Sequence, residues 1–500
     1  MKKIFTLLLS VATAISASAT DYNEVITVTV NGESTEQTGI VSVTDNGDTF
    51  DLTLRNFMLN SEDGAMGVGN IAVNGIKATR TGNAVVLETS QTVTITEGDD
   101  QQVPFWMATI LPPVPVNLRG VVEDDHLRCY IDIDLQKEMQ QTIQVAVGEG
   151  YQMLNPGFEA WHTSSGNYME PNRWHSFESA TGSLASMAGH HITRSEDAHS
   201  GQYSARIFAT SILGIVANGT MTTGRMNAGS MSAANTANHA YLDTSSSDVD
   251  GNGDPYFMPL YSRPDSIVAW VKFSQGKANA QNPYATISAV ITDGTRYQDP
   301  EDKTYTNVVA RAKNNTIATT GGQWVRIAAP FVYTEASVEP KAILVTVSTN
   351  ANAGKGSNND EVLTDDISLV YNARLTSLKV KGEDVPNFSP DITEYELGIA
   401  GDLTTDDITA EADGMAARIV KSVETTADGL NCIVTVYSGD MATATRYTVK
   451  VKNTTTVIAT RTTQNVAPVC YSPDGRRLKA PRRGTVTIVR QGDGTVKKVL

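Results

Sequence analysis

The sequence has few cysteines, almost no helical periodicity, and no long apolar segment beyond its extreme N-terminus. Its three cysteines, Cys129, Cys432 and Cys470, are too few and too far apart in 500 residues to form a disulfide framework. We expect buried thiols, with a Cys432–Cys470 bridge as the less favoured alternative. No later segment is apolar for long enough to cross a membrane as a helix, so we expect no transmembrane segment.

Basic residues are also in short supply. The chain has 39 Lys and Arg against 55 Asp and Glu, which gives a formal charge of −16 at pH 7. An acidic balance argues against a nucleic-acid partner. It suits a protein that works outside the cell and that offers sites for cations.

The N-terminus reads as a secretory signal. Lys2 and Lys3 precede an apolar stretch from Ile4 to Ile15, and Ala17-Ser-Ala19 supplies small residues for cleavage. We therefore predict a signal peptide over residues 1–19. The mature protein is expected to be secreted, either in the periplasm or in association with the outer cell surface.

Alternating apolar and polar residues recur along the whole chain, which predicts an all-β protein. Residues 20–148 contain many short strands joined by tight turns, as in a closed up-and-down barrel. This stretch resembles the calycin-like β-barrel modules of exported Bacteroidetes proteins at Val30-Asn-Gly-Glu33, Met66-Gly-Val-Gly-Asn-Ile71 and Ile131-Asp-Ile-Asp134. Such a barrel either holds a small apolar ligand or is filled by its own side chains, and we favour the filled barrel.

Residues 149–372 carry a second pattern of strands. The segment Asn155-Pro-Gly-Phe-Glu-Ala-Trp161 opens it, and Leu363-Thr-Asp-Asp-Ile-Ser-Leu369 closes it. Both segments resemble the first and last strands of carbohydrate-binding jelly rolls, and the whole region is similar to the carbohydrate-metabolism domains of Bacteroidetes. The resemblance implies a jelly-roll β-sandwich and a glycan ligand. The further shared elements are Pro171-Asn-Arg-Trp174, His199-Ser-Gly-Gln-Tyr-Ser-Ala205, Ser266-Ile-Val-Ala-Trp-Val-Lys-Phe273 and Gly322-Gln-Trp324.

Two smaller modules follow. Residues 373–453 are similar to the cadherin-like or immunoglobulin-like sandwiches of bacterial surface proteins, which mostly act as spacers. Residues 454–500 form a basic β tail, with nine Lys or Arg and two Asp from Arg461 onward. This tail resembles C-terminal sorting modules, although Thr485 stands where the family has an aromatic residue. A small hairpin that caps the preceding sandwich is the alternative.

The most ligand-like run is Asp248-Val-Asp-Gly-Asn-Gly-Asp254. Oxygen-bearing side chains at alternate positions, with glycines to bend the backbone, are typical of loops that bind Ca²⁺. Asp248, Asp250, Asn252 and Asp254 are therefore candidate ligands, although Pro259 replaces the bidentate Glu of an EF-hand loop. A solvated acidic loop is the alternative.

A second cation site is implied by the jelly-roll resemblance. In related sandwiches, a Glu in the first strand and an Asp in the last strand bind a structural calcium. Here these residues would be Glu159 and Asp366, or Asp365 in its place. Such an ion would join both ends of the sandwich and restrain fraying.

Aromatic side chains near loops are candidate sugar platforms, because the C–H faces of pyranose rings stack on aromatic rings. For each one a place in the core is the competing interpretation. Trp270 and Trp324 alternate within strands and are expected in the core. The candidate ligand-binding residues are Trp161, Trp174, Tyr256 and Tyr261.

These patterns predict a carbohydrate-binding protein that recognises a poly- or oligosaccharide, with calcium in a structural role. A glycoside hydrolase is the first alternative, since Glu170, Glu178, Asp243 and Asp254 could supply paired carboxylates, although no spacing selects a pair. The second alternative is a surface adhesion or assembly protein without a sugar ligand.

Overall fold

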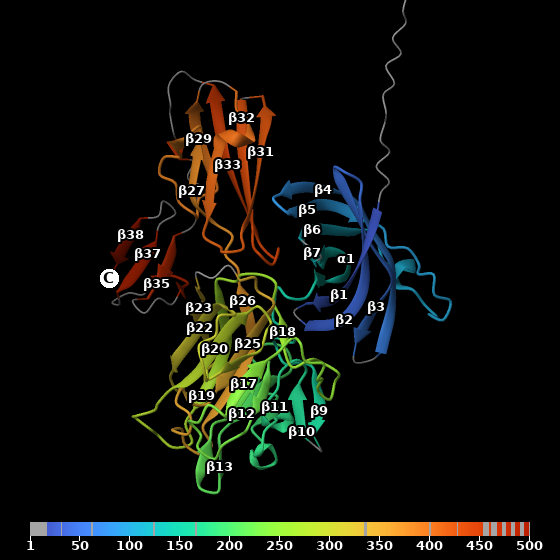
Figure 1. Ribbon diagram of the computed structural model, residues 1–500. Helices are drawn as coiled ribbons and strands as arrows, with labels where there is room; N and C mark the ends of the chain where they lie inside the picture. The colour runs from blue at the N-terminus through green and yellow to red at the C-terminus, as the bar shows by residue number, and fades with distance from the viewer. Residues whose placement is uncertain are drawn as a thin grey trace, which may run out of the picture. The chain divides into compact units, whose positions relative to one another are not determined.

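The computed structural model describes residues 18–499, except 32, 62–63, 124–125, 166–167, 335–337, 400–401, 428, 454–459, 462–467, 473–476, 482–485 and 491–494. Nearly all of the regular structure in this part is β-strand (Figure 1), which confirms the predicted all-β class. Most of the expected signal peptide, and parts of the C-terminal sorting-like motifs, lie outside the described residues. Within them, no helix has the length and apolar character needed to cross a membrane.

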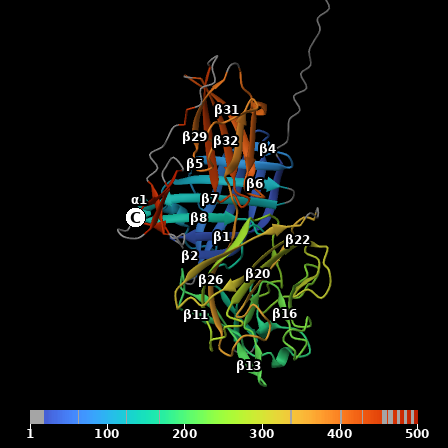
Figure 2. The same cartoon turned by 90° about the vertical axis from the view of Figure 1, so that its left-hand side faces the viewer.

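The first module is a closed barrel of eight antiparallel strands in sequence order, because β1 pairs with both β2 and β8. Figure 2 shows β5 to β8 running side by side in its wall. Every strand contributes buried apolar side chains to one cluster, so the interior is a packed core. The strands are β1 (Ser18–Val30), β2 (Glu33–Asp45), β3 (Thr49–Ser61), β4 (Gly64–Thr81), β5 (Ala84–Val93), β6 (Val114–Glu123), β7 (His126–Leu135) and β8 (Gln141–Val147), with one turn of helix, α1 (Gln136–Met139), before β8.

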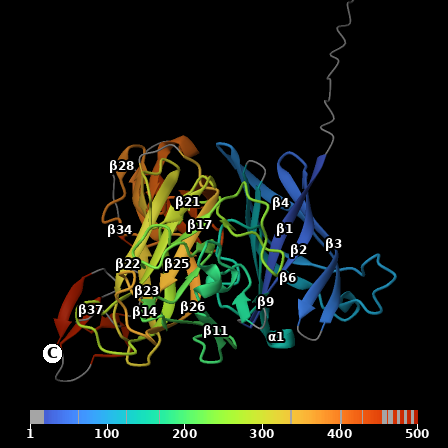
Figure 3. The same ribbon diagram turned by 60° about the horizontal axis from the view of Figure 1, so that its bottom comes forward.

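The second module is built on two antiparallel sheets with non-sequential strand order (Figure 3). In the central strands of both sheets most side chains are buried, and the majority of the buried ones are apolar. The five-stranded sheet has the order β11 (Ile192–Ser195), β12 (Ser204–Phe208), β26 (Glu361–Val370), β19 (Ser266–Ser274) and β23 (Val325–Pro330). The second sheet has the order β15 (Thr220–Thr222), β25 (Ala342–Ser348), β20 (Ala285–Thr292), β22 (Val308–Ile317) and β24 (Val332–Tyr333), with β18 (Met258–Pro259) also paired to β25.

Smaller elements surround these two sheets. They supply the walls and the polar cluster described below. They are the hairpins β9 (Trp161–Ser165)–β10 (Tyr168–Pro171) and β13 (Thr210–Ile212)–β14 (Ile215–Ala217), the three-stranded sheet β16 (Arg225–Asn227), β17 (His239–Leu242) and β21 (Tyr297–Asp299), and two 3-10 turns at Phe177–Ser179 and Ala185–Met187.

The chain divides into two compact units, and the second consists of residues 263–265 together with those from 370 onward. The main part of this unit is a three-stranded sheet facing a five-stranded one across a single apolar cluster. A four-stranded sheet, β35 to β38, follows near the C-terminus. The strands are β27 (Leu375–Val380), β28 (Glu383–Asp384), β29 (Glu394–Ile399), β30 (Ile408–Ala412), β31 (Arg418–Thr426), β32 (Gly429–Tyr437), β33 (Ala444–Asn453), β34 (Thr460–Arg461), β35 (Val469–Tyr471), β36 (Arg477–Leu478), β37 (Thr487–Arg490) and β38 (Val496–Val499).

All three cysteines are buried, free thiols. Cys129 lies in the barrel core and Cys432 in the core of the second unit. The structure therefore has buried thiols, as favoured from sequence, and no Cys432–Cys470 bridge.

Candidate functional site

A cleft of about 750 Å³ opens on the β15–β25–β20–β22 sheet of the second module. Side chains alternate between the two faces of a strand. Met221, Val347 and Ile287 are therefore buried, whereas the hydroxyl residues beside them line the cleft. The volume falls within the range of about 300–1,000 Å³ that is usual for small-molecule sites.

The floor of this cleft carries two rows of polar side chains, each running across neighbouring strands. Residues directly opposite each other on antiparallel strands have Cβ atoms about 4.5–5.5 Å apart. Each row thus presents hydrogen-bonding groups at regular strand spacing. The first row is Thr220, Ser348 and Thr286, and the second is Thr346, Ser288 and Lys313.

The walls of the cleft are apolar. They come from the 3-10 turns at 177–179 and 185–187, from the β13–β14 hairpin at one end of the module (Figure 1), and from the 230–240 loop. Phe177 is the one aromatic side chain among the described residues that line the cleft, apart from the imidazole of His239. Apolar wall residues include Leu184, Met187, Ile212, Ile215, Met226 and Met231.

One end of the cleft is lined by asparagines. The Asn218 Nδ2 donates to the carbonyl oxygen of Asn350 at 3.1 Å, and the Asn350 Nδ2 donates to the carbonyl oxygen of Asn282 at 3.0 Å. The Asn352 Nδ2 donates to Asn282 Oδ1 at 3.0 Å. Asn218 Oδ1 is buried and accepts no hydrogen bond in the described part of the chain. The amides thus fix one another and leave one acceptor for another donor.

Two titratable groups add acceptors to the lining. Asp299, at the end of β21, accepts a hydrogen bond from Ser288 Oγ at 3.0 Å. Burial lowers the pKa of His239, which keeps its imidazole neutral at pH 7. Its Nδ1 lies 2.9 Å from the carbonyl oxygen of Thr236 and so carries the proton, which leaves Nε2 as an acceptor.

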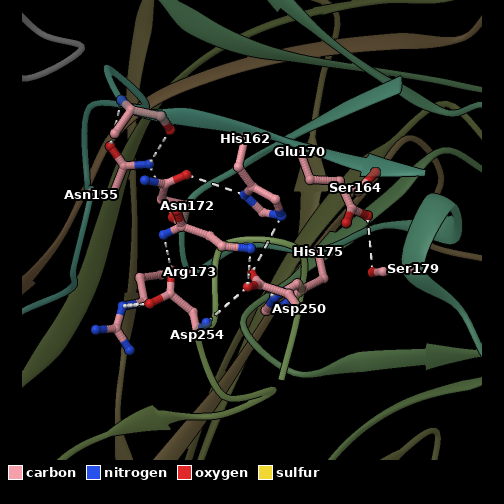
Figure 4. Close-up of polar contacts among 12 residues, drawn as sticks. Asn155, His162, Ser164, Glu170, Asn172, Arg173, His175, Ser179, Asp250 and Asp254 are labelled. Atoms are coloured by element: carbon pink, nitrogen blue, oxygen red, sulfur yellow. Dashed lines mark hydrogen bonds and ion pairs between the residues drawn. The ribbon is translucent and has the colours of Figure 1, made fainter. Parts of the chain in front are cut away.

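The predicted acidic loop lies outside this cleft and forms a polar cluster of its own (Figure 4). Asp250 is buried between two imidazoles, with its Oδ2 3.1 Å from His175 Nε2 and 3.4 Å from His162 Nε2. Its Oδ1 accepts from the backbone N–H groups of Asn252 and Asp254, both at 2.8 Å. Burial acts to raise the pKa of Asp250, but the hydrogen bonds from His175 and the Asp254 amide outweigh it and lower that pKa.

The other acidic residues of this loop also face N–H donors. Asp254 Oδ1 is 3.1 Å from Arg173 Nε, and its Oδ2 accepts from Asn252 Nδ2 at 2.8 Å. Asp248 is largely exposed and lies 3.1 Å from Arg225. The loop is therefore held to the module by cationic and N–H groups, and its carboxylates do not converge on one point.

The second predicted calcium site brings its residues close together. The opening and closing segments lie side by side, since the Ile367 N–H donates to the carbonyl oxygen of Pro156 at 3.0 Å. Glu159 Oε1 accepts from the N–H groups of residues 202 and 203, and Asp365 Oδ2 accepts from the N–H groups of residues 199 and 200. Burial, and next the charge of Asp366, raise the pKa of Asp365 to about 7.

Both ends of the module thus bind the same turn, 199–203. Asp366 Oδ2 lies 2.6 Å from His199 Nδ1, and its Oδ1 accepts from Ser200 Oγ at 2.8 Å. Across the described residues, however, no three His, Cys, Asp or Glu side chains are grouped in a way that could hold a metal ion. Calcium at either place remains a prediction from sequence.

The four aromatic candidates do not line the cleft. Trp174 is fully buried, packs edge-on against Phe158, and donates its indole N–H to the Leu154 carbonyl, so it offers no exposed face. Trp161 is partly buried and donates to the carbonyl oxygen of Phe158. The remaining two are half-buried: Tyr256 lies beneath the Arg225 guanidinium, and Tyr261 stacks on His126 with ring centroids 4.0 Å apart.

Two carboxylates beside the cluster are buried with one oxygen each unpaired among the described residues. Glu170, on β10, accepts from the Ser176 N–H and Ser179 Oγ through Oε1, whereas its Oε2 has no partner in this part of the chain. Glu178 Oε1 faces the side chain of His190, and its Oε2 is likewise unpaired within the described residues. Burial, and next the charge of Glu178, raise the pKa of Glu170 to about 8, so it is mostly protonated at pH 7.

The floor of the cleft was missed in the sequence, although its signal is present. Thr286 and Ser288 are two residues apart in β20, and Thr346 and Ser348 are two residues apart in β25. Hydroxyl residues at this spacing share one face of a strand. The pattern becomes a site only through the pairing of β20 with β25, which joins segments about sixty residues apart and cannot be read from either strand alone.

Comparison with known proteins bears mainly on the first module. A search of curated proteins found no match. A solved structure described as a "putative glycoside hydrolase from bacteroides thetaiotaomicron" has 11% identity and a TM-score of 0.29, covering 69% of this chain and 83% of that chain. A likeness this weak carries no argument about function. Residues 19–147 match the family model of the calycin-like beta-barrel domain, and the closed eight-stranded barrel identifies this part of the chain as such a domain.

Proposed function

We propose that this chain is an exported carbohydrate-binding protein that takes up a poly- or oligosaccharide in the cleft of its second module. The observation that carries the proposal is a floor of hydroxyl groups between apolar walls. Sugar rings present hydroxyl groups at their edges and C–H groups on their faces. The floor and the walls complement these two surfaces. The jelly-roll resemblance of residues 149–372 points to the same ligand class.

Catalysis is less well supported than binding. A glycosidase places two carboxylates on either side of the scissile bond, about 5 or about 6.5–9.5 Å apart. Among the described residues that line the cleft, Asp299 is the one carboxylate. Glu170 has the raised pKa of a general acid but is fully buried, so it cannot reach a glycosidic bond in this conformation.

For calcium we propose only a structural role, near Glu159 and Asp366. There the mutual repulsion of Asp365 and Asp366 would be relieved by a cation. The side chains described do not form a complete group of metal ligands, so no step of sugar binding is assigned to the ion.

A glycan array with the full-length secreted chain tests the proposal, followed by titration calorimetry on any glycan that binds. Thr346→Val removes one floor hydroxyl with little change in shape. Loss of one neutral hydrogen bond should weaken binding about 5- to 10-fold. Thr425→Val is the matched control, because Thr425 is an exposed strand residue in the other compact unit.

The outcomes separate the three classes of function. Binding without new reducing ends, weakened by Thr346→Val and not by Thr425→Val, supports carbohydrate binding. New reducing ends would replace it with the glycoside hydrolase. No binding to any glycan would favour a surface adhesion or assembly role, and a partner protein should then be sought by pull-down.

A further inference from the structure

The charges that line the cleft differ in sign from those of the chain as a whole. The chain carries a formal charge of −16, yet two lysines, Lys313 and Lys355, line the cleft against a single carboxylate, Asp299. His239 adds no charge at pH 7, because burial lowers its pKa. The lining therefore has one net positive charge, opposite in sign to the charge of the chain as a whole.

Lys313 is fixed in the floor by the strand register. It lies on β22 directly opposite Ser288 of β20, so both side chains project from the same face of the sheet into the cleft. Lys313 ends the second row of polar groups, after Thr346 and Ser288. An ammonium group at this place is next to the hydroxyls that are proposed to bind the sugar ring.

Within the described part of the chain, the ammonium groups of Lys313 and Lys355 form no ion pair and donate no hydrogen bond. Some other basic side chains of this module do form ion pairs: Lys272 with Asp197, Arg206 with Glu361 and Arg311 with Glu301.

Asp299 offsets only one of the two lysine charges. One of its oxygens already accepts a hydrogen bond from Ser288, and it forms no ion pair with Lys313. Ser288 donates to the Asp299 carboxylate and lies opposite Lys313 in the strand register, so a strong acceptor and a strong donor occur near one hydroxyl. This arrangement suits a sugar residue that carries both hydroxyl groups and one anionic substituent.

We infer that the saccharide bound in the cleft is anionic, with a carboxylate or sulfate group placed against Lys313. The inference rests on the proposed carbohydrate-binding function and narrows its ligand class. Lys355 lies on the loop at the asparagine end of the cleft. It provides a second cation for a neighbouring anionic residue of the bound saccharide.

Titration calorimetry of the full-length chain with matched oligosaccharides tests the inference. The probes are oligogalacturonates, their neutral galacto-oligosaccharide counterparts, and sulfated galacto-oligosaccharides that contain no uronic acid. Comparing the affinities for uronates and for sulfates distinguishes a carboxylate from a sulfate as the bound anionic group. Affinity for the charged probe should fall as salt is raised, because an exposed ion pair is screened.

The variants are Lys313→Met, Lys313→Arg and, as a control, Lys341→Met, which removes an exposed lysine outside the cleft lining. Lys313→Met should weaken binding of the anionic oligosaccharide about 10- to 100-fold, the usual range for losing a charge-assisted hydrogen bond. Lys313→Arg should retain most of the affinity, and binding of neutral oligosaccharides should not change.

Two results would overturn the inference in distinguishable ways. If neutral oligosaccharides bind as tightly as anionic ones, and Thr346→Val weakens them while Lys313→Met does not, the cleft binds sugar without selecting charge. If no saccharide binds at all, the proposed function fails and the inference fails with it.

Discussion

The buried carboxyl group of Glu170 should limit the stability of the second module at alkaline pH. Its side chain is fully buried, and the pKa is raised from 4.5 to about 8 by burial and by Glu178. Glu170→Gln replaces the protonated carboxyl by a neutral group of the same shape. The amide oxygen can still accept from Ser176 and Ser179, and among the described residues the other carboxyl oxygen has no hydrogen bond to lose.

The sign and size of the effect follow from proton linkage. Between about pH 4.5 and pH 8 the folded chain holds this proton and the unfolded chain releases it, so stability falls as the pH rises. Each pKa unit corresponds to about 1.4 kcal/mol, so the carboxylate costs about 5 kcal/mol at most above pH 8. Relaxation and water entry on ionisation reduce this, and we expect Glu170→Gln to gain about 2–3 kcal/mol at alkaline pH.

Urea denaturation followed by tryptophan fluorescence at about pH 5 and about pH 9 measures this gain. Four of the five tryptophans, at positions 161, 174, 270 and 324, lie in the second module, so the signal reports mainly on it. The variant should be close to wild type at the lower pH and more stable at the higher pH. Glu196→Gln is the matched control, because Glu196 is an exposed residue of the same module.

A second variant checks the assigned cause. Glu178→Gln removes the charge that helps to raise the Glu170 pKa. The loss of stability with rising pH should therefore be smaller in this variant, and it should end at a lower pH than in the wild type. The reasoning is refuted if Glu170→Gln follows the wild-type pH profile, or if it is less stable than wild type at pH 9 while Glu196→Gln is unaffected.

Three further predictions concern the polar cluster and the joined ends of the module. Asp250→Ala should lower the free energy of unfolding by about 3–5 kcal/mol in urea titrations, because it leaves buried N–H donors unpaired, whereas the exposed Asp248→Ala should change it by less than about 0.5 kcal/mol. The raised pKa of Asp365, about 7 against 3.8, makes stability fall from about pH 4 to pH 7, and Asp365→Asn should flatten that part of the pH profile; an unchanged slope contradicts the assignment. If calcium joins Glu159 and Asp366, elemental analysis should find it in the purified chain, and chelation should lower the melting temperature; a metal-free protein with unchanged melting would refute that site.

Much of the fold can be predicted from the sequence, because strands appear in it as a local alternation of apolar and polar residues. The Val41, Val43, Phe50 and Leu52 pattern around Asn46-Gly47 predicts one hairpin of the barrel, and β2 and β3 pair there. Strand order in the second module is different. There β12 pairs with β26 and β15 with β25, across more than a hundred residues, and no local pattern specifies such partners.

The candidate site, like the fold, can be predicted from the sequence only in part. The acidic loop can be recognised in the sequence from its density of Asp residues. Its carboxylates, however, pair with His175, Arg173 and Arg225, which lie elsewhere in the sequence. Trp174 stands out as a large aromatic, but its burial follows from packing and not from its neighbours along the chain. The cleft floor is made of ordinary Thr and Ser residues, which attract attention only after the strands are paired.

The two rows of the cleft floor also bear on the direction in which a saccharide chain would bind. Neighbouring strands are about 4.8 Å apart, and residues on one face of a strand recur about every 6.8 Å, so the hydroxyls form a small two-dimensional lattice. A lattice of like groups cannot by itself distinguish one direction of a polymer from the other. Lys313 breaks that symmetry, because it ends one row with a charge while the other row ends in Thr286. Lys313, the one lysine within the two rows, would therefore set the polarity with which a saccharide chain lies across the sheet.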